Sequence, residues 1–116
     1  MKKSTQQLAR EHDKYEVRAR YIRALAHPAR LFIVDELAES ERCVNDLHIL
    51  IGGDRTTLSK HLAVLRDAGV VLTEKRGAQV YYRLRTPCIL GFFGCIEQAL
   101  RQVATEQLTA AGGRRK

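Results

Sequence analysis

The sequence predicts a mainly α-helical domain with a small β-hairpin, arranged as a winged helix-turn-helix. Three observations support this fold class: a helix, a glycine turn and a second helix in succession, two β-prone runs directly behind them, and an excess of positive charge over both. The first helix of the pair begins at Cys43, and Gly52-Gly53 provide a tight turn. Asp54 is a good N-cap for the second helix, whose pattern breaks at Gly69.

The β-prone runs cover Val70–Thr73 and Gln79–Leu84, and we expect the charged segment 74–77 to form the turn between them. From residue 54 to residue 85, seven basic residues stand against three acidic ones, a local charge of +4 out of +7 for the chain. In this fold the N-terminal part of the second helix enters the major groove of DNA. We place the helix-turn-helix at residues 43–69 and the wing at residues 70–85.

Length and composition are those of a single soluble domain. The 116 residues allow one modest core, and 45% hydrophobic and 28% charged residues are ordinary values. The pI near 9.7 favours a polyanionic partner, whereas 6% aromatic residues and no Trp argue against stacking on single-stranded nucleic acid. The first residues lack the apolar region of a signal peptide, and no apolar run approaches the ~20 residues that span a bilayer. We therefore expect a cytoplasmic protein that does not bind membranes.

The helices that flank this unit, residues 5–26 and 87–108, each carry an apolar stripe at helical spacing. The last stripe is too strong for an exposed terminus, so we expect both helices to pack across a homodimer interface; for residues 5–26, packing on the chain's own core is the alternative. Residues 109–116 are expected to be a disordered basic tail. The stripes are Leu8, Tyr15, Ala19, Ile22 and Ala26 in the first helix and Ile89, Phe93, Ile96, Leu100 and Val103 in the last.

Pro28 predicts the start of a helix over residues 29–38, and residues 39–42 are expected to form a polar turn. His61 lies beside an inward-facing stripe, so we expect a structural role for it in preference to a DNA contact or a metal ligand. The side chains expected to face inward are Leu31, Val34 and Leu37, then Val44, Leu47, Leu50 and Ile51, then Leu58, Leu62 and Leu65.

Four segments resemble the ArsR/SmtB repressors, in order and with sensible spacing over roughly residues 20–85. The resemblance implies a homodimeric winged-helix protein that binds double-stranded operator DNA and releases it when a metal or metalloid binds. It also implies that residues 55–61 read DNA and that the turn around residues 76–79 is the wing. The segments are ALAHPARL (24–31), CVNDL (43–47), TLSKHLAVLRDAGVV (57–71) and GAQVYYRL (77–84).

Basic and small polar side chains at these two places are our candidates for DNA contact. Arg and Lys suit guanine edges, and Thr can bond to several edges. The candidates are Arg55, Thr56, Thr57 and Lys60 for base edges, Ser59 for phosphate, and Lys75 and Arg76 on the wing for phosphate or the minor groove.

The three cysteines, Cys43, Cys88 and Cys95, are the candidate metal ligands. The family's arsenic sensors commonly carry Cys-Val-Cys-Asp-Leu, and Asn45 stands here in place of the second cysteine. The last helix has no His, which argues against the family's zinc and cobalt sites. Three thiolates suit a soft ion, so As(III) or Sb(III) is the expected inducer, with Cd(II) or Pb(II) as alternatives.

Cys88 and Cys95 are seven residues apart, which places their Cα atoms ~10.5 Å apart along a regular helix. This separation is too large for two thiolates to hold one small ion. Gly91 and Gly94 lie between them, so an irregular segment is one solution. The other is a thiol borrowed from Cys43 or from the second subunit.

These observations predict a metalloid-responsive repressor that binds operator DNA. A repressor of the same fold that senses thiol oxidation or persulfide is the main alternative, and a non-specific DNA binder is another. We expect no enzyme, because no nucleophile, base and orienting group occur together. Cys95 and Arg101 match the spacing of thiol phosphatases and arsenate reductases, but the apolar helix between them cannot form an anion-binding loop.

Overall fold

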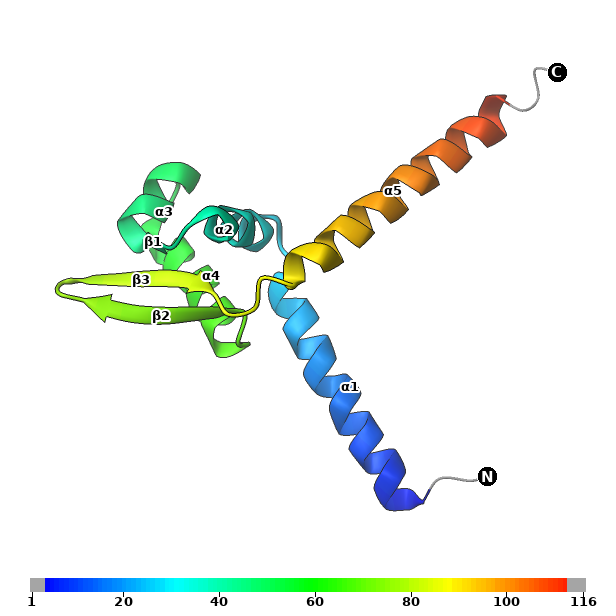
Figure 1. Ribbon diagram of the computed structural model, residues 1–116, viewed down its shortest axis with the longest axis horizontal. Helices are drawn as coiled ribbons and strands as arrows, with labels where there is room; N and C mark the ends of the chain where they lie inside the picture. Colours follow the sequence, from blue (N-terminus) through cyan, green and yellow to red (C-terminus); the bar gives the residue numbers. More distant parts are fainter. Residues whose placement is uncertain (1–3, 113–116) are drawn as a thin grey trace. The chain divides into compact units, whose positions relative to one another are not determined.

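The computed structural model describes residues 4–112, which divide into two compact units between Thr86 and Pro87. Figure 1 shows the order of the elements along the chain. The elements are α1 (Thr5–Leu25), α2 (Pro28–Glu39), β1 (Arg42–Cys43), α3 (Val44–Ile51), α4 (Arg55–Asp67), β2 (Val71–Arg76), β3 (Gln79–Leu84) and α5 (Ile89–Gly112).

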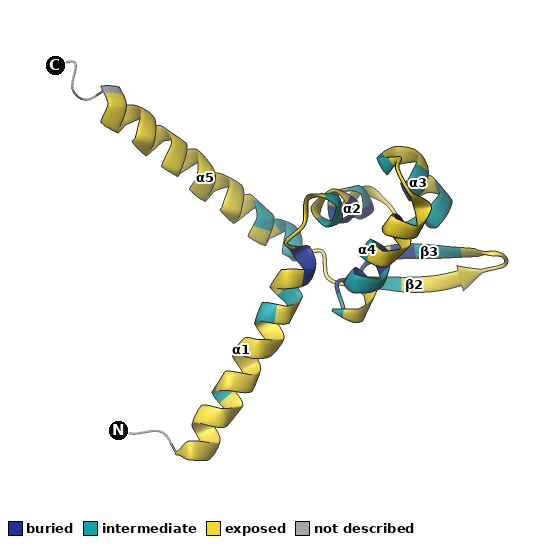
Figure 2. Cartoon of the chain, turned by 180° about the vertical axis from the view of Figure 1, so that it is seen from behind, coloured by how far each residue is buried: buried dark blue, intermediate teal, exposed yellow. Residues whose placement is uncertain are grey.

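The core of the first unit lies among α2, α3, α4 and the sheet, where the buried residues of Figure 2 gather. The stripe predicted for the second helix of the pair is confirmed, because Leu58, Leu62 and Leu65 are all buried. Full burial of one such side chain contributes about 1.5–3 kcal/mol. This core fixes the position of α4.

The inward faces predicted for the two preceding helices are partly wrong. In α2 the buried residues are Ile33, Val34 and Leu37, while Leu31 is 39% exposed. In α3 only Leu47 is buried, and Leu50 is 45% exposed. The segments 31–34 of α2 and 49–51 of α3 are continuous apolar runs, so periodicity could not show which of their side chains meet the core.

The sheet has three antiparallel strands in the order β1-β3-β2. The predicted turn 74–77 is wrong at its first three residues, because β2 continues to Arg76 and pairs it with Gln79. A two-residue turn remains, and Gly77 has the positive φ of 61° that such a turn requires. Charged residues suit β2 as an edge strand, since they discourage pairing with another chain.

The strand β1 takes the last residue of the polar turn predicted for residues 39–42 and the first residue of the helix predicted to begin at Cys43. Arg42 pairs with Tyr82 and Cys43 with Tyr81, so β1 covers the free edge of β3. A two-residue strand carries no periodic signal and depends on a partner about 40 residues away. The sequence could not have indicated it.

The helix α1 begins at a capping box, in which Ser4 and Gln7 each accept a hydrogen bond from the other's backbone N–H. Only Ala24 and Leu25, at its C-terminal end, are buried. The apolar stripe predicted from the sequence is otherwise uncovered: Tyr15, for example, is 59% exposed. The stripe is therefore available to a partner.

The second unit is the single helix α5, whose apolar side chains are also uncovered; Leu100 is 63% exposed. Gly91 and Gly94 lie within the helix, so the irregular segment between Cys88 and Cys95 is not formed. Residues 109–112, expected to begin the tail, continue the helix, and residues 113–116 lie outside the described range. No helix among residues 4–112 is both long and apolar enough to cross a membrane.

Candidate nucleic-acid interface

The start of α4 is held by its N-cap. The Asp54 carboxylate accepts hydrogen bonds from both the backbone N–H (3.1 Å) and the hydroxyl (3.0 Å) of Thr57. The hydroxyl bond, followed by the backbone bonds, lowers the pKa of Asp54 below its ordinary value. Thr57, predicted to read bases, thus has its hydroxyl proton directed to the cap. In this conformation Thr57 stabilises the first turn.

The turn between α3 and α4 is fixed from both sides. Gly52 and Gly53 adopt positive φ angles of 75° and 72°, which glycine tolerates without strain. The Nε2 atom of His48, in α3, lies 3.0 Å from the carbonyl oxygen of Gly53. Arg55 donates to the amide oxygen of Asn45 across the turn. Asn45, the residue that replaces the second cysteine of the family's arsenic sensors, therefore orients a predicted DNA-contact residue.

Three further predicted residues, Thr56, Ser59 and Lys60, form an exposed face at the start of α4. They are spaced by three and four residues, so they lie on one side of the helix. Their side chains make no hydrogen bond or ion pair within the part of the chain that the structure describes. This face can donate and accept hydrogen bonds and carries one free positive charge.

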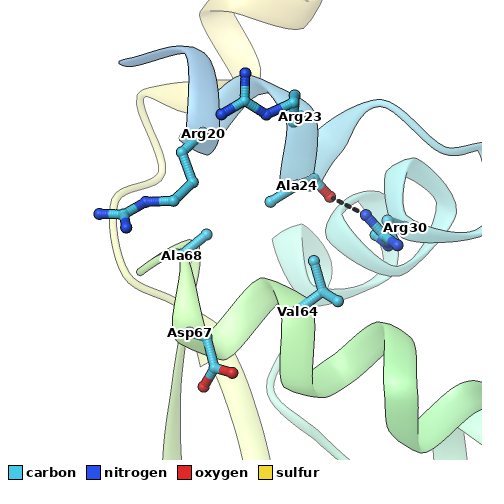
Figure 3. A pocket seen from close by; sticks show the side chains of 7 residues that line it. All are labelled: Arg20, Arg23, Ala24, Arg30, Val64, Asp67 and Ala68. Carbon is cyan, nitrogen blue, oxygen red and sulfur yellow. Dashed lines mark hydrogen bonds between the residues drawn. The ribbon is translucent and has the colours of Figure 1, made fainter. Parts of the chain in front are cut away.

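His61 lies on α4 at the side facing α2. Its Nδ1 atom accepts a hydrogen bond from Arg30 Nε (3.1 Å), and its ring centroid is 4.4 Å from that of His27. Arg30 also donates to the Ala24 carbonyl (3.3 Å), as Figure 3 shows. Partial burial, then the nearby His27 and Arg30, lowers the pKa of His61. These contacts support the structural role expected for this residue.

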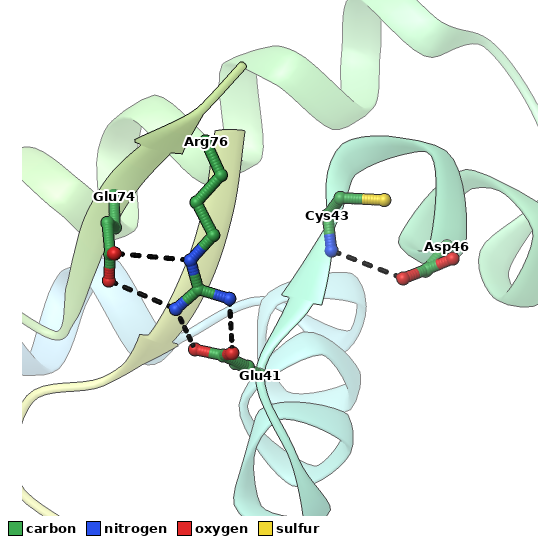
Figure 4. A network of polar contacts seen from close by, with 5 residues as sticks. All are labelled: Glu41, Cys43, Asp46, Glu74 and Arg76. Carbon is green, nitrogen blue, oxygen red and sulfur yellow. Dashed lines mark hydrogen bonds and ion pairs between the residues drawn. The ribbon is translucent and has the colours of Figure 1, made fainter. Parts of the chain in front are cut away.

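On the wing, Arg76 is enclosed by two carboxylates (Figure 4). Its Nη1 and Nη2 atoms donate to Glu41 at 2.5 and 2.9 Å, and its Nε and Nη2 atoms donate to Glu74 at 3.1 and 3.0 Å. Four of its five N–H donors are therefore used. The guanidinium also lies over the Tyr81 ring, 4.7 Å from the centroid. We call Arg76, Glu41, Glu74 and Tyr81 the wing clamp.

The clamp changes what Arg76 can offer to DNA. Its hydrogen bonds lower the pKa values of Glu41 and Glu74, so both carboxylates stay ionised, and in turn they raise the pKa of Arg76. A phosphate could pair with two N–H donors of this guanidinium only by displacing a carboxylate. Lys75 is exposed and makes no ion pair among residues 4–112, so it is the freer cation of the wing.

The three cysteines are free thiols in different environments. Cys43 is buried at the N-cap of α3, where its backbone N–H donates to Asp46 at 3.3 Å. Cys88 and Cys95 are exposed, just before and within α5. Cys88 lies in the turn before α5, and α5 runs without a break from Ile89 through Gly91 and Gly94 to Cys95 and beyond. Among residues 4–112, no three His, Cys, Asp or Glu side chains are grouped so as to hold a metal ion.

Comparison with known proteins gives one consistent result. Residues 27–73 match the family described as bacterial regulatory protein, arsR family. The HTH-type transcriptional repressor SmtB of Mycobacterium tuberculosis is 46% identical over 63 residues, which cover 54% of this chain and 47% of that protein. The chain thus spans about half the length of that relative. The uncharacterized HTH-type regulator Rv0081 of M. tuberculosis is 33% identical over 81% of this chain and 83% of its own length.

Solved structures agree with this assignment of fold. The crystal structure of Rv0081 matches with a TM-score of 0.72 at 33% identity, covering 81% of this chain and 95% of that one. Mb0332 of Mycobacterium bovis, described as a homodimeric winged helix-turn-helix DNA-binding domain, matches with a TM-score of 0.71 at 28% identity, covering 88% and 91%. Reduced HlyU of Vibrio cholerae matches with a TM-score of 0.66 at 26% identity, covering 78% and 95%. The predicted winged helix-turn-helix is confirmed.

Proposed function

We propose that this chain, which belongs to the ArsR family of bacterial regulatory proteins, is a transcriptional repressor that binds operator DNA as a homodimer. The observation that carries the proposal is the free polar face of Thr56, Ser59 and Lys60 at the start of α4. In a helix-turn-helix this end of the second helix enters the major groove. No catalytic activity is proposed.

The exposed apolar stripes of α1 and α5 support the homodimer. Side chains such as Leu8 and Leu100 are 54% and 63% exposed, which a stable soluble helix avoids unless a partner covers it. The similar domain Mb0332 is described as homodimeric. Two symmetric copies would present two α4 helices to half-sites about one DNA turn apart.

Each part of the interface then has a distinct role. Thr56 and Lys60 face base edges, and Ser59 and Lys75 meet phosphates. Asp54 and Thr57 hold the first turn of α4, and Asn45 orients Arg55 toward the groove. The clamp keeps the wing in place through Arg76, whose own contact with DNA requires the clamp to open.

The test is selection of DNA from a randomised double-stranded library, followed by fluorescence anisotropy with the selected and scrambled duplexes at several salt concentrations. We expect a two-fold symmetric selected site and tighter binding to it than to scrambled DNA. Equal affinity for both, falling identically with salt, would identify a non-specific binder and contradict the proposal.

We propose further that cysteine thiols receive the signal, with As(III) or Sb(III) as the inducer. Three free thiols are the soft ligand set that trivalent metalloids favour. The third ligand of such a site comes either from Cys43 of the same chain or from a thiol of the second subunit. Cd(II) and Pb(II), which also favour thiolates, are the other ions to test.

A thiol redox or persulfide sensor is the second candidate, and the exposure of Cys88 and Cys95 favours it. An exposed thiol can be oxidised without unfolding the protein. The similarity to HlyU, a protein for which a reduced form is described, points the same way.

Titration of the protein–operator complex separates the two candidates. We expect arsenite or antimonite to release the wild type, and Cys88→Ser and Cys95→Ser to keep binding DNA while losing this release. Cadmium, lead and zinc salts, and hydrogen peroxide or a persulfide donor, are titrated in parallel. Release by oxidant, with an intramolecular cysteine cross-link in the mass spectrum and no response to arsenite, would replace the metalloid proposal by the redox one.

A further inference from the structure

A cavity of about 360 Å³ lies in the first unit, where the end of α1, the start of α2 and the end of α4 meet (Figure 3). Three arginines line it: Arg20 and Arg23 from α1 and Arg30 from α2. Small apolar side chains, Ala24, Val64 and Ala68, line the rest. We call this cavity the arginine pocket.

None of the three arginines of the pocket is paired with a carboxylate among the described residues. Arg30 bonds only to neutral acceptors, the His61 ring and the Ala24 carbonyl. The side chains of Arg20 and Arg23 make no hydrogen bond or ion pair within residues 4–112. The one acid of the lining, Asp67, is paired with Arg66 at 3.2 Å, and its carboxylate points away from the pocket in Figure 3.

This arrangement leaves an excess of positive charge at the pocket, where Arg20 and Arg23 are exposed. Arg20 and Arg23 are three residues apart on one helix, a spacing at which like charges repel each other. Arg30 is half-buried, so its charge is less well hydrated and depends more on a counterion. An oxyanion in the pocket would relieve both costs, because guanidinium groups bind carboxylate and phosphate oxygens through paired N–H donors.

The position of the pocket separates it from the DNA-reading face. Val64 is eight residues after Thr56, which places it about 12 Å further along the α4 axis. A phosphate of the DNA read by the start of α4 is therefore not the natural occupant. The apolar lining further favours a ligand with an apolar body over a bare inorganic anion.

We propose that the arginine pocket is a binding site for a small organic oxyanion, with its charged group between the arginines and its apolar body against Ala24, Val64 and Ala68. Residues of three helices would contact the ligand. The proposal does not depend on DNA binding, because the pocket and its test involve none of the residues assigned to DNA contact.

The experiment is an NMR titration of the full chain, following the backbone amides of Ala24, Val64 and Ala68 at constant ionic strength. The probes are benzoate, phenylphosphonate, neutral benzamide and inorganic phosphate. We expect saturable shifts with benzoate or phenylphosphonate, and roughly tenfold weaker binding of benzamide and of inorganic phosphate. Benzoate and phenylphosphonate distinguish a carboxylate from a phosphorus oxyanion as the preferred charged group.

Two variants and a matched control locate the site. Arg20→Gln and Arg23→Gln should each weaken binding of the preferred probe, and neither removes a hydrogen bond that holds the described fold. Arg18→Gln removes the same charge from α1 outside the pocket, and should leave binding unchanged. Equal weakening by all three variants, equal binding of benzamide and benzoate, equal binding of inorganic phosphate, or the absence of saturable shifts would each overturn the proposal.

Discussion

The start of α4 and the wing hold their basic side chains in opposite ways. On α4, Lys60 is exposed and without an ion pair among the described residues, beside a helix cap that fixes the backbone under it. On the wing, Arg76 is enclosed by Glu41 and Glu74 and uses four of its five N–H donors within the protein. One cation is free to move onto DNA, and the other is already bound.

The difference shows that a local excess of positive charge does not measure the charge available to a ligand. The charge of +4 over residues 54–85 includes Arg76, which two carboxylates neutralise, and one of them, Glu41, lies outside that range. The clamp therefore gives the wing a defined position at the expense of a phosphate contact. Substitutions at three positions test whether the free and the paired basic side chains differ in their contribution to DNA binding.

The largest effect is expected from Lys60→Ala. Removing a free cation that we propose faces a base edge should weaken binding to the selected operator by about 1–3 kcal/mol, or roughly 5-fold to 150-fold, without changing the melting temperature. Fluorescence anisotropy and a thermal melt measure the two quantities. Lys14→Ala, which removes an exposed lysine from α1, is the matched control. Equal affinities of Lys60→Ala and the wild type would show that α4 reads DNA by another face.

A smaller effect is expected from Asp54→Ala, which removes the cap beneath the reading face. We expect a lower melting temperature and a several-fold weaker operator complex, because the first turn of α4 loses two hydrogen bonds. Asp54→Asn keeps a hydrogen-bond acceptor at the N-cap, so its melting temperature and its affinity for the operator should fall less.

The pH dependence gives a second measure of this cap. The pKa of Asp54 is depressed in the folded protein, so the stabilisation is present above the ordinary value of 3.8 and is lost as the pH falls through the folded value. The wild type and Asp54→Asn should therefore converge in stability on acidification below about pH 4. A constant difference across this range would mean that the carboxylate charge contributes nothing to the cap.

The smallest effect is expected from Glu41→Gln. The substitution opens one side of the clamp and frees N–H donors of Arg76, so DNA binding should become modestly tighter and its salt dependence steeper by about one phosphate contact. Anisotropy as a function of salt measures the slope. Glu39→Gln, an exposed acid outside the clamp, controls for the change in net charge. Identical slopes for the two variants would show that the clamp does not withhold Arg76 from DNA.

Much of the candidate interface could be predicted from local signals in the chain. Asp54 as the N-cap, Gly52-Gly53 as the turn and the apolar stripe of α4 all act within one or two helical turns, and all are present. The wing clamp could not be predicted, because Glu41 and Arg76 are 35 residues apart and meet only when β1 pairs with β3. The hydrogen bond from Arg30 to His61 joins residues that are 31 apart in the sequence, so it could not be predicted either.

The cysteines also show which properties of a site the sequence can predict and which it cannot. Their number and their softness as ligands follow from the sequence, and so does the two-turn spacing of Cys88 and Cys95. The suggestion that Gly91 and Gly94 would interrupt the helix was wrong, because glycine permits an irregular backbone without requiring one. α5 continues through both glycines, so the helix is not interrupted between Ile89 and Cys95.

By itself, the sequence predicted the five helices, the hairpin and the helix that we propose faces DNA, because caps, glycine turns and helical periodicity are local properties of the backbone. The family followed from the resemblance of four segments. Tertiary structure decided which charges are free, since pairing depends on which distant side chains come within hydrogen-bonding distance. Among the described residues it left Lys60 without an ion pair, enclosed Arg76 between two acids, and gathered Arg20, Arg23 and Arg30 around a cavity whose one acid, Asp67, pairs with Arg66.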